Sequence, residues 1–141
     1  MKQHVISSLS LNDYLSYHDI GKNDIFKEPL LLQIGFNKTA TTFLEEFYGC
    51  FANTITIQGA KYTEFNYFAQ YVLNAPDEEF DVKTARALFT IGVNAVPSKR
   101  CDIFMYEGLT FSYWHFFNQN HVIKRLSKIF LKSKFIIGTR N

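Results

Sequence analysis

Short apolar runs alternate along this chain with longer stretches whose apolar residues recur at helical spacing. Four of the short runs, 30–35, 54–57, 103–106 and 134–139, are expected to form strands. A nearly unbroken apolar run is typical of a strand that is buried on both faces, as in parallel sheets. Because the intervening segments are long enough for crossovers, the pattern predicts a mainly parallel sheet with helices on both faces. We therefore expect a three-layer α/β/α fold.

The segments between these runs have the apolar spacing of amphipathic helices. The expected helical ranges are 40–48, 65–73, 81–89 and a longer, broken region over 111–132 that is clearest at 121–131. Asp81 is the expected N-cap of the third helix, and the basic residues of the last one, including Arg125, are expected on a solvated polar face. Residues 1–29 are expected to form a lead-in with a short helix, and residues 30–141 the α/β unit.

Charge and cysteine content argue against several classes of protein. With 47% hydrophobic residues and 15 Lys and Arg against 13 Asp and Glu, the chain differs from disordered tails, which are poor in hydrophobic residues and highly charged. A net charge of +2 spread along the chain argues against a nucleic-acid-binding module. Cys50 and Cys101 cannot make a disulfide framework and lack metal-ligand spacing. No apolar stretch is long enough to span a membrane and the N-terminus does not resemble a signal peptide, so a cytoplasmic location is expected.

Polar groups follow three of the predicted strands, at the point where each strand ends. They are the loop 37–42, Glu107 and Arg140. Ligands of parallel α/β sheets bind at the carboxyl ends of the strands. We therefore expect the functional site where these three segments converge.

The loop after the first predicted strand carries the strongest chemical signal. A strand that runs through a tight loop into a helix presents free backbone N–H groups and the positive end of the helix dipole, which together bind anions. Lys38 adds a point charge, and Thr39, Thr41 and Thr42 add hydroxyl donors, so the loop is expected to hold a phosphate. The Walker A loop of ATPases is absent, because no Gly precedes Lys38, which lies three residues after Gly35.

The spacing of this loop resembles the 5′-phosphosulfate loop of the sulfotransferases that use 3′-phosphoadenosine 5′-phosphosulfate (PAPS), approximately G-x-x-K-[ST]-G-T-[ST]-x-L. The chain matches that loop at Gly35, Lys38, Thr39, Thr41, Thr42 and Leu44. It departs at Ala40, where the family usually has Gly.

Two further segments are similar to that family. Residues 135–141 resemble the first half of its 3′-phosphate motif, an apolar strand that ends in Arg, and Arg140 takes the position of the phosphate-binding Arg. Residues 106–109 are similar to a stretch that ends a strand in bacterial members, where Glu is the acceptor-activating base, and Glu107 takes that position. A weaker similarity links residues 63–68 to the family's Lys-Glu-x-x-Phe-Phe segment, although Thr63 replaces the Lys.

The resemblance implies a P-loop NTPase-like sheet and an enzyme that moves a sulfuryl group from PAPS to a hydroxyl or amine, without a metal. The implied cofactor-binding residues are Gly35, Asn37, Lys38, Thr39, Ala40, Thr41, Thr42 and Arg140, and the implied catalytic residues are Lys38 and Glu107. His115 is an alternative base. The acceptor, whether saccharide, lipid or small alcohol, does not follow from the sequence. Because the family's motif continues beyond this Arg, the chain is expected to be an N-terminal part of such a domain, weak or inactive alone.

Other interpretations of the same residues stay open. A nucleotide-binding kinase or ATPase is one alternative, and a non-catalytic α/β interaction domain is another. Lys38 and Arg140 are then ordinary surface charges, and Glu107 caps the following segment or pairs with a surface Lys.

Overall fold

The structure, a computed structural model, describes residues 10–18, 25–35, 41–50, 52–56, 64–105 and 119–138. Within these ranges the helices are α2 (Leu11–Tyr17), α3 (Thr41–Gly49), α4 (Glu64–Asn74), α5 (Val82–Ala95) and α6 (Gln119–Ile129). The strands are β1 (Leu31–Gly35), β2 (Thr54–Thr56), β3 (Ile103–Met105) and β4 (Lys134–Gly138). The four predicted strands are therefore confirmed to within a residue at their described ends.

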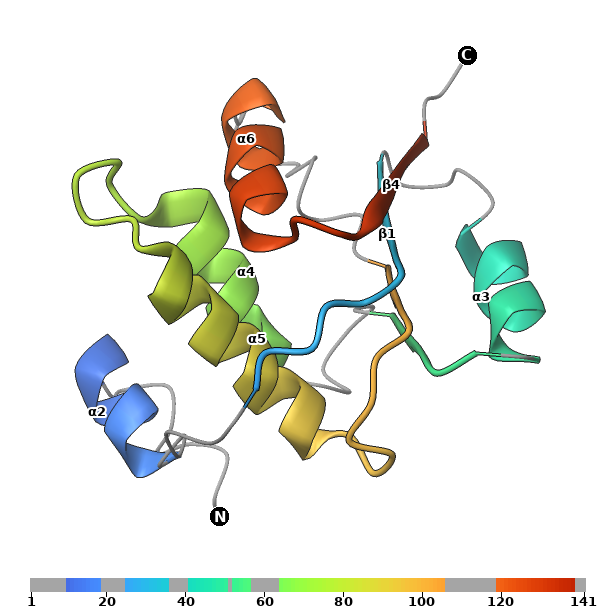
Figure 1. Ribbon diagram of the computed structural model, residues 1–141, viewed down its shortest axis with the longest axis horizontal. Helices are drawn as coiled ribbons and strands as arrows, with labels where there is room; N and C mark the ends of the chain where they lie inside the picture. The colour runs from blue at the N-terminus through green and yellow to red at the C-terminus, as the bar shows by residue number, and fades with distance from the viewer. Residues whose placement is uncertain are drawn as a thin grey trace.

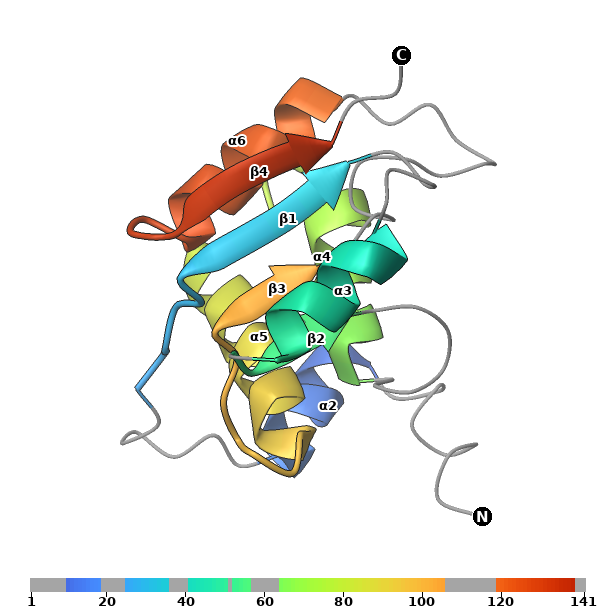
Figure 2. The ribbon, with the colours of Figure 1, turned by 90° about the vertical axis from the view of Figure 1, so that its right-hand side faces the viewer.

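The four strands form one sheet in the order β2-β3-β1-β4, and every neighbouring pair is parallel. Figure 2 shows β4, β1 and β3 side by side and running in the same direction. The predicted parallel sheet is confirmed.

Helices cover both faces of this sheet. In Figure 1, α3 lies on one side of the sheet, and α4, α5 and α6 lie on the other. Right-handed crossovers account for the division, because the connection from β1 through α3 to β2 crosses the sheet in the opposite direction to the connection from β3 through α6 to β4. The expected three-layer α/β/α arrangement is confirmed.

An aromatic cluster fills the space between the sheet and the three-helix layer. Its centre is Phe89 of α5, whose ring lies 5.1 Å from that of Phe104 in β3 and 5.0 Å from that of Phe130 after α6. Phe65 and Phe68 of α4 complete the cluster at 5.5 and 5.3 Å from Phe89. All five side chains are fully buried, so this cluster joins the sheet to the helices that cover it.

The helix α5 begins as predicted and extends beyond its predicted end. The Asp81 side chain accepts a hydrogen bond of 2.7 Å from the backbone N–H of Thr84, which confirms it as the N-cap. The helix continues to Ala95 rather than ending near Phe89, because its buried stripe runs on through Gly92 and Val93. Its second half thereby contributes to the core.

Asp102 ties together the amino-terminal ends of three strands. Its carboxylate accepts hydrogen bonds from the backbone and side-chain amides of Asn53, before β2, at 3.0 and 2.8 Å. Its backbone carbonyl accepts a bond of 2.7 Å from Leu30, before β1. Burial opposes ionisation of this carboxyl, but the hydrogen bonds from Asn53 and Arg100 outweigh it and lower its pKa. These hydrogen bonds therefore hold β1, β2 and β3 together at their amino-terminal ends.

Arg125 corrects the expectation of a solvated basic face on the last helix. Only 4% of this residue is exposed, because it lies three residues after the buried Val122 and four before the buried Ile129 and so shares their face of α6. Its guanidinium donates to the backbone carbonyls of Val72 and Ala75, at 2.8 and 2.6 Å. These are carbonyls at the carboxyl-terminal end of α4, where a cation complements the helix dipole.

Candidate functional site

The carboxyl ends of three strands lie side by side at one edge of the sheet. The strand β1 lies between β3 and β4, and its last residue, Gly35, is the register partner of Gly138, the last residue of β4. Met105 ends β3 and is the register partner of Gln33 in β1. The three segments that carry the candidate residues therefore leave the sheet from adjacent strands (Figure 2).

The direction in which the connections cross the sheet reverses between β1 and β3. The chain leaves β1 toward the face covered by α3, and it leaves β3 toward the face covered by α6, on the way to β4. Such a topological switch point opens a crevice outside the strand ends, which is where open α/β sheets bind their ligands. The strand order therefore places the switch point at the ends of β1 and β3.

The helix that follows β1 begins at this same edge. The helix α3 starts at Thr41, six residues after the end of β1, and is nine residues long. Its first backbone N–H groups have no partner within the helix, and the positive end of its dipole lies there. The arrangement of strand, short connection and helix that the sequence predicted is confirmed for the described residues.

Most of the predicted site residues lie outside the described residues. They are Asn37, Lys38, Thr39, Ala40, Glu107, Arg140 and the alternative base His115. Gly35 ends β1, and the backbones of Thr41 and Thr42 form the first turn of α3. What the structure brings together is the ends of the elements that carry these residues, and their side-chain roles stay predictions.

Gln33 is a residue near this edge that sequence reasoning missed. The core under α4, α5 and α6 contains Leu32 and Ile34, so alternation along β1 turns Gln33 toward the other face, next to Met105 and Ile136 in the neighbouring strands. Only 4% of Gln33 is exposed, and its Oε1 accepts no hydrogen bond from the described residues. The sequence does contain a signal for this residue, because Gln33 is an amide in an otherwise apolar strand.

Residues 64–68 are the described part of the segment that was compared with Lys-Glu-x-x-Phe-Phe, and its two phenylalanines pack in the core. Phe65 and Phe68 are fully buried in the aromatic cluster. Glu64 begins α4 and is partly buried. Burial raises the pKa of the Tyr14 hydroxyl in α2, and the negative charge of Glu64 raises it further. The Tyr14 ring stacks on Tyr67 of α4 at 3.9 Å, which fixes α2 against the start of that helix.

His121 and the cysteines have ordinary surroundings in the described part of the chain. His121 Nε2 lies 3.2 Å from the Asp77 carboxylate. Cys50 is exposed, and burial raises the pKa of the Cys101 thiol. No cluster of three or more His, Cys, Asp or Glu side chains suited to a metal ion occurs among the described residues. None of the described helices is long and apolar enough to cross a membrane.

Comparison of the chain with models of protein families, with characterised proteins and with solved structures finds no match.

Proposed function

We propose that this chain is part of a PAPS-dependent sulfotransferase and binds the nucleotide at the carboxyl edge of its sheet. The observation that supports this most is the pairing of β1 with β4, in which Gly35 and Gly138 are register partners. The two segments that resemble the phosphosulfate loop and the 3′-phosphate motif each leave one of these two strands.

The pairing of β1 with β4 limits how far apart the two predicted phosphate ligands can lie, which supports the proposal. Paired strands lie about 5 Å apart. Lys38 lies three residues after Gly35 and Arg140 two residues after Gly138. Because an extended chain covers at most about 3.6 Å per residue, the Lys38 and Arg140 backbones lie within about 11 and 7 Å of those two points. These limits agree with the proposal that a single molecule with a 5′-phosphosulfate and a 3′-phosphate contacts both side chains.

In the proposed reaction, the sulfuryl group leaves the 5′-phosphate oxygen and forms a new S–O or S–N bond with the acceptor. Negative charge accumulates on the leaving phosphate, and Lys38 with the first amides of α3 would stabilise it. Arg140 would hold the 3′-phosphate and so orient the donor. Glu107, two residues after the end of β3, would take the proton of the acceptor hydroxyl or amine, with His115 as the alternative base. The proposed acceptor is a hydroxyl or amine of a saccharide, lipid or small alcohol.

Calorimetry with adenosine 3′,5′-bisphosphate, the product nucleotide, tests the proposal without requiring turnover by these 141 residues. We expect the wild-type chain to bind it without added magnesium. Lys38→Ala and Arg140→Ala should each weaken binding by about tenfold or more, because each removes a charge-assisted hydrogen bond to phosphate. Lys124→Ala, which removes an exposed lysine of α6, is the matched control and should leave the affinity unchanged.

Two results would contradict the proposal. One is binding of ATP only with magnesium and no binding of the bisphosphate, which would favour a kinase or ATPase. The other is the absence of binding to either nucleotide by a chain that circular dichroism shows to be folded, which would favour an interaction domain.

A further inference from the structure

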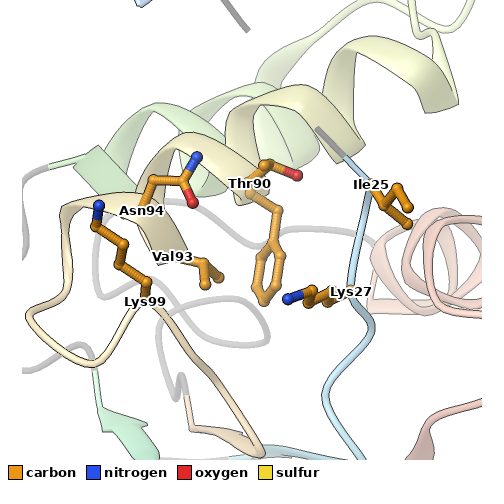
Figure 3. A pocket seen from close by; sticks show the side chains of 7 residues that line it. Ile25, Lys27, Thr90, Val93, Asn94 and Lys99 are labelled. Carbon is orange, nitrogen blue, oxygen red and sulfur yellow. The ribbon is translucent and has the colours of Figure 1, made fainter. Parts of the chain in front are cut away.

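A pocket lies where the strands of the sheet begin, at the opposite end of the strands from the proposed nucleotide site. Its volume is about 260 Å³, and its lining comes from α5, from the segment before β1 and from the turn before β3 (Figure 3). The lining residues are Ile25, Lys27, Phe89, Thr90, Val93, Asn94 and Lys99. Because it lies where the strands begin, this pocket is independent of the residues that the proposed function uses.

Lys27 and Lys99 give the pocket two positive charges, and none of the described acidic side chains pairs with either of them. Lys27 and Lys99 stand on opposite sides of it in Figure 3, with Asn94 nearer to Lys99. Neither ammonium group makes a hydrogen bond or an ion pair with another described residue, and the lining contains no Asp or Glu. The neighbouring Arg100 differs, because its guanidinium is paired with Asp102 at 2.9 Å. A bound anion would therefore complement the charge of the lining residues.

Lys99 is held in a backbone conformation that non-glycine residues rarely adopt. Its φ is 49°, in the left-handed region, and no other non-glycine residue of the described part has a positive φ. Its backbone N–H donates to the carbonyl of Val96 at 2.8 Å, which closes the turn after α5. Such strain costs about 1–3 kcal/mol and gathers at ligand sites. The turn thus keeps a charged side chain at the pocket in spite of a local cost.

The floor of the pocket is apolar. Phe89 and Val93 are buried residues of α5 that line it, and the exposed Ile25 closes one side. The Thr90 hydroxyl donates to the backbone carbonyl of Arg86 at 2.8 Å, so its oxygen can still accept a hydrogen bond. The volume lies just below the range of about 300–1,000 Å³ typical of drug-sized ligands, which indicates a smaller molecule.

We propose that this pocket binds a small organic monoanion, a carboxylate on an aromatic or short aliphatic group. The carboxylate lies between Lys27 and Lys99 and accepts from the amide of Asn94, and the apolar part lies against Val93 and Ile25, above the fully buried Phe89. The pocket adjoins the last turn of α5, whose dipole disfavours an anion, and the two ammonium groups offset that field.

A titration of the full chain with benzoate, followed by two-dimensional ¹H–¹⁵N NMR, tests the proposal. We expect saturable shifts at the amides of Thr90, Val93, Asn94 and Lys99, with a dissociation constant of about 1 mM or tighter. Lys27→Met and Lys99→Met should each weaken binding by about fivefold or more, because each removes a charge-assisted contact. Lys83→Met, which removes an exposed lysine of α5 outside the pocket, should leave it unchanged.

Two further probes separate the charge from the apolar part of the ligand. Benzamide has the shape of benzoate without the charge, and inorganic phosphate has charge without an apolar group; both should bind at least about fivefold more weakly. The proposal is overturned if phosphate or benzamide binds as well as benzoate. It is also overturned if benzoate shifts none of the lining amides, or if neither lysine variant changes its affinity.

Discussion

Replacing Gly92 by alanine tests how closely α5 packs against α4. A Cβ atom at this position would lie 2.6 Å from both Cδ1 and Cε1 of Phe65 and 2.9 Å from its Cγ. Carbon atoms in contact are about 3.5–4.0 Å apart, so the ring would have to move by about 1 Å. The ring has little room to move, because it is fully buried with Phe89 and Phe104 at 5.5 and 5.3 Å.

The size of the effect follows from two opposing contributions. Alanine is favoured over glycine inside a helix by about 0.8–1.0 kcal/mol. Overpacking a filled core costs about 1–3 kcal/mol. We therefore expect Gly92→Ala to lower the free energy of unfolding by up to about 2 kcal/mol. Gly49→Ala is the matched control, because a Cβ at Gly49 of α3 would meet no atom within 4 Å, and it should be neutral or slightly stabilising.

Urea unfolding followed by circular dichroism measures both variants. A double-mutant cycle with Phe65→Leu isolates the clash, because the smaller side chain should make Gly92→Ala neutral or stabilising. A clash with Phe65 is refuted if Gly92→Ala is as stable as Gly49→Ala. It is also refuted if Gly92→Ala still lowers the free energy of unfolding when leucine stands at position 65.

Three further predictions concern buried polar groups and can be checked by the same unfolding measurement. Arg125→Met should cost about 1–3 kcal/mol for each of the two helix-terminal carbonyls that it leaves without a donor, whereas Asp77→Asn should cost far less because Asp77 is exposed; equal losses would show that the ion pair dominates. Gln33→Leu should leave the chain as stable as the wild type or more so, since the buried Oε1 of Gln33 accepts no hydrogen bond from the described residues, and a clear loss of stability would mean that the amide is satisfied. The pKa of Asp102 is lowered in the folded chain, so its contribution is full above the unfolded pKa of about 3.9 and is lost as the pH falls through the folded value. Asp102→Asn should therefore flatten the dependence of the urea midpoint on pH below about pH 4, and an unchanged profile would exclude the bonds to Asn53 as the cause.

The strands and the layers were predictable because buried parallel strands leave a clear sequence pattern. A run such as Leu31–Gly35 is almost continuously apolar, and the breaker at Pro76 separates α4 from α5. The strand order was not predicted. It depends on which strands pair over long sequence separations, and single runs of three to five residues carry little information about their partners.

Individual polar residues were harder to interpret than elements. Arg125 was expected in solvent because charged residues usually are, but its place in the helical period of α6 put it on the buried face. Gln33 was counted as part of an apolar run, although it is a polar residue whose side-chain Oε1 accepts no hydrogen bond from the described residues. In both cases the position in the helix or strand decided the environment, and the residue type alone did not.

The candidate site was predictable as far as its location in the fold. Loops that follow Gly35, Met105 and Gly138 were expected to converge, and the strand order places these three ends side by side. The roles of Lys38 and Arg140 depend on side-chain positions outside the described residues, and the sequence motif remains their support.

In the proposed function, the ends of β1 and β4 bind one nucleotide together. An NMR titration with adenosine 3′,5′-bisphosphate measures this directly through the amides of Gly35, Thr41 and Gly138. We expect these amides, from both strands and from α3, to shift along one saturation curve, while those of Thr90 and Asn94 at the opposite edge stay unchanged. Shifts at the β1 end without any at Gly138, or no shift at either strand end, would contradict it.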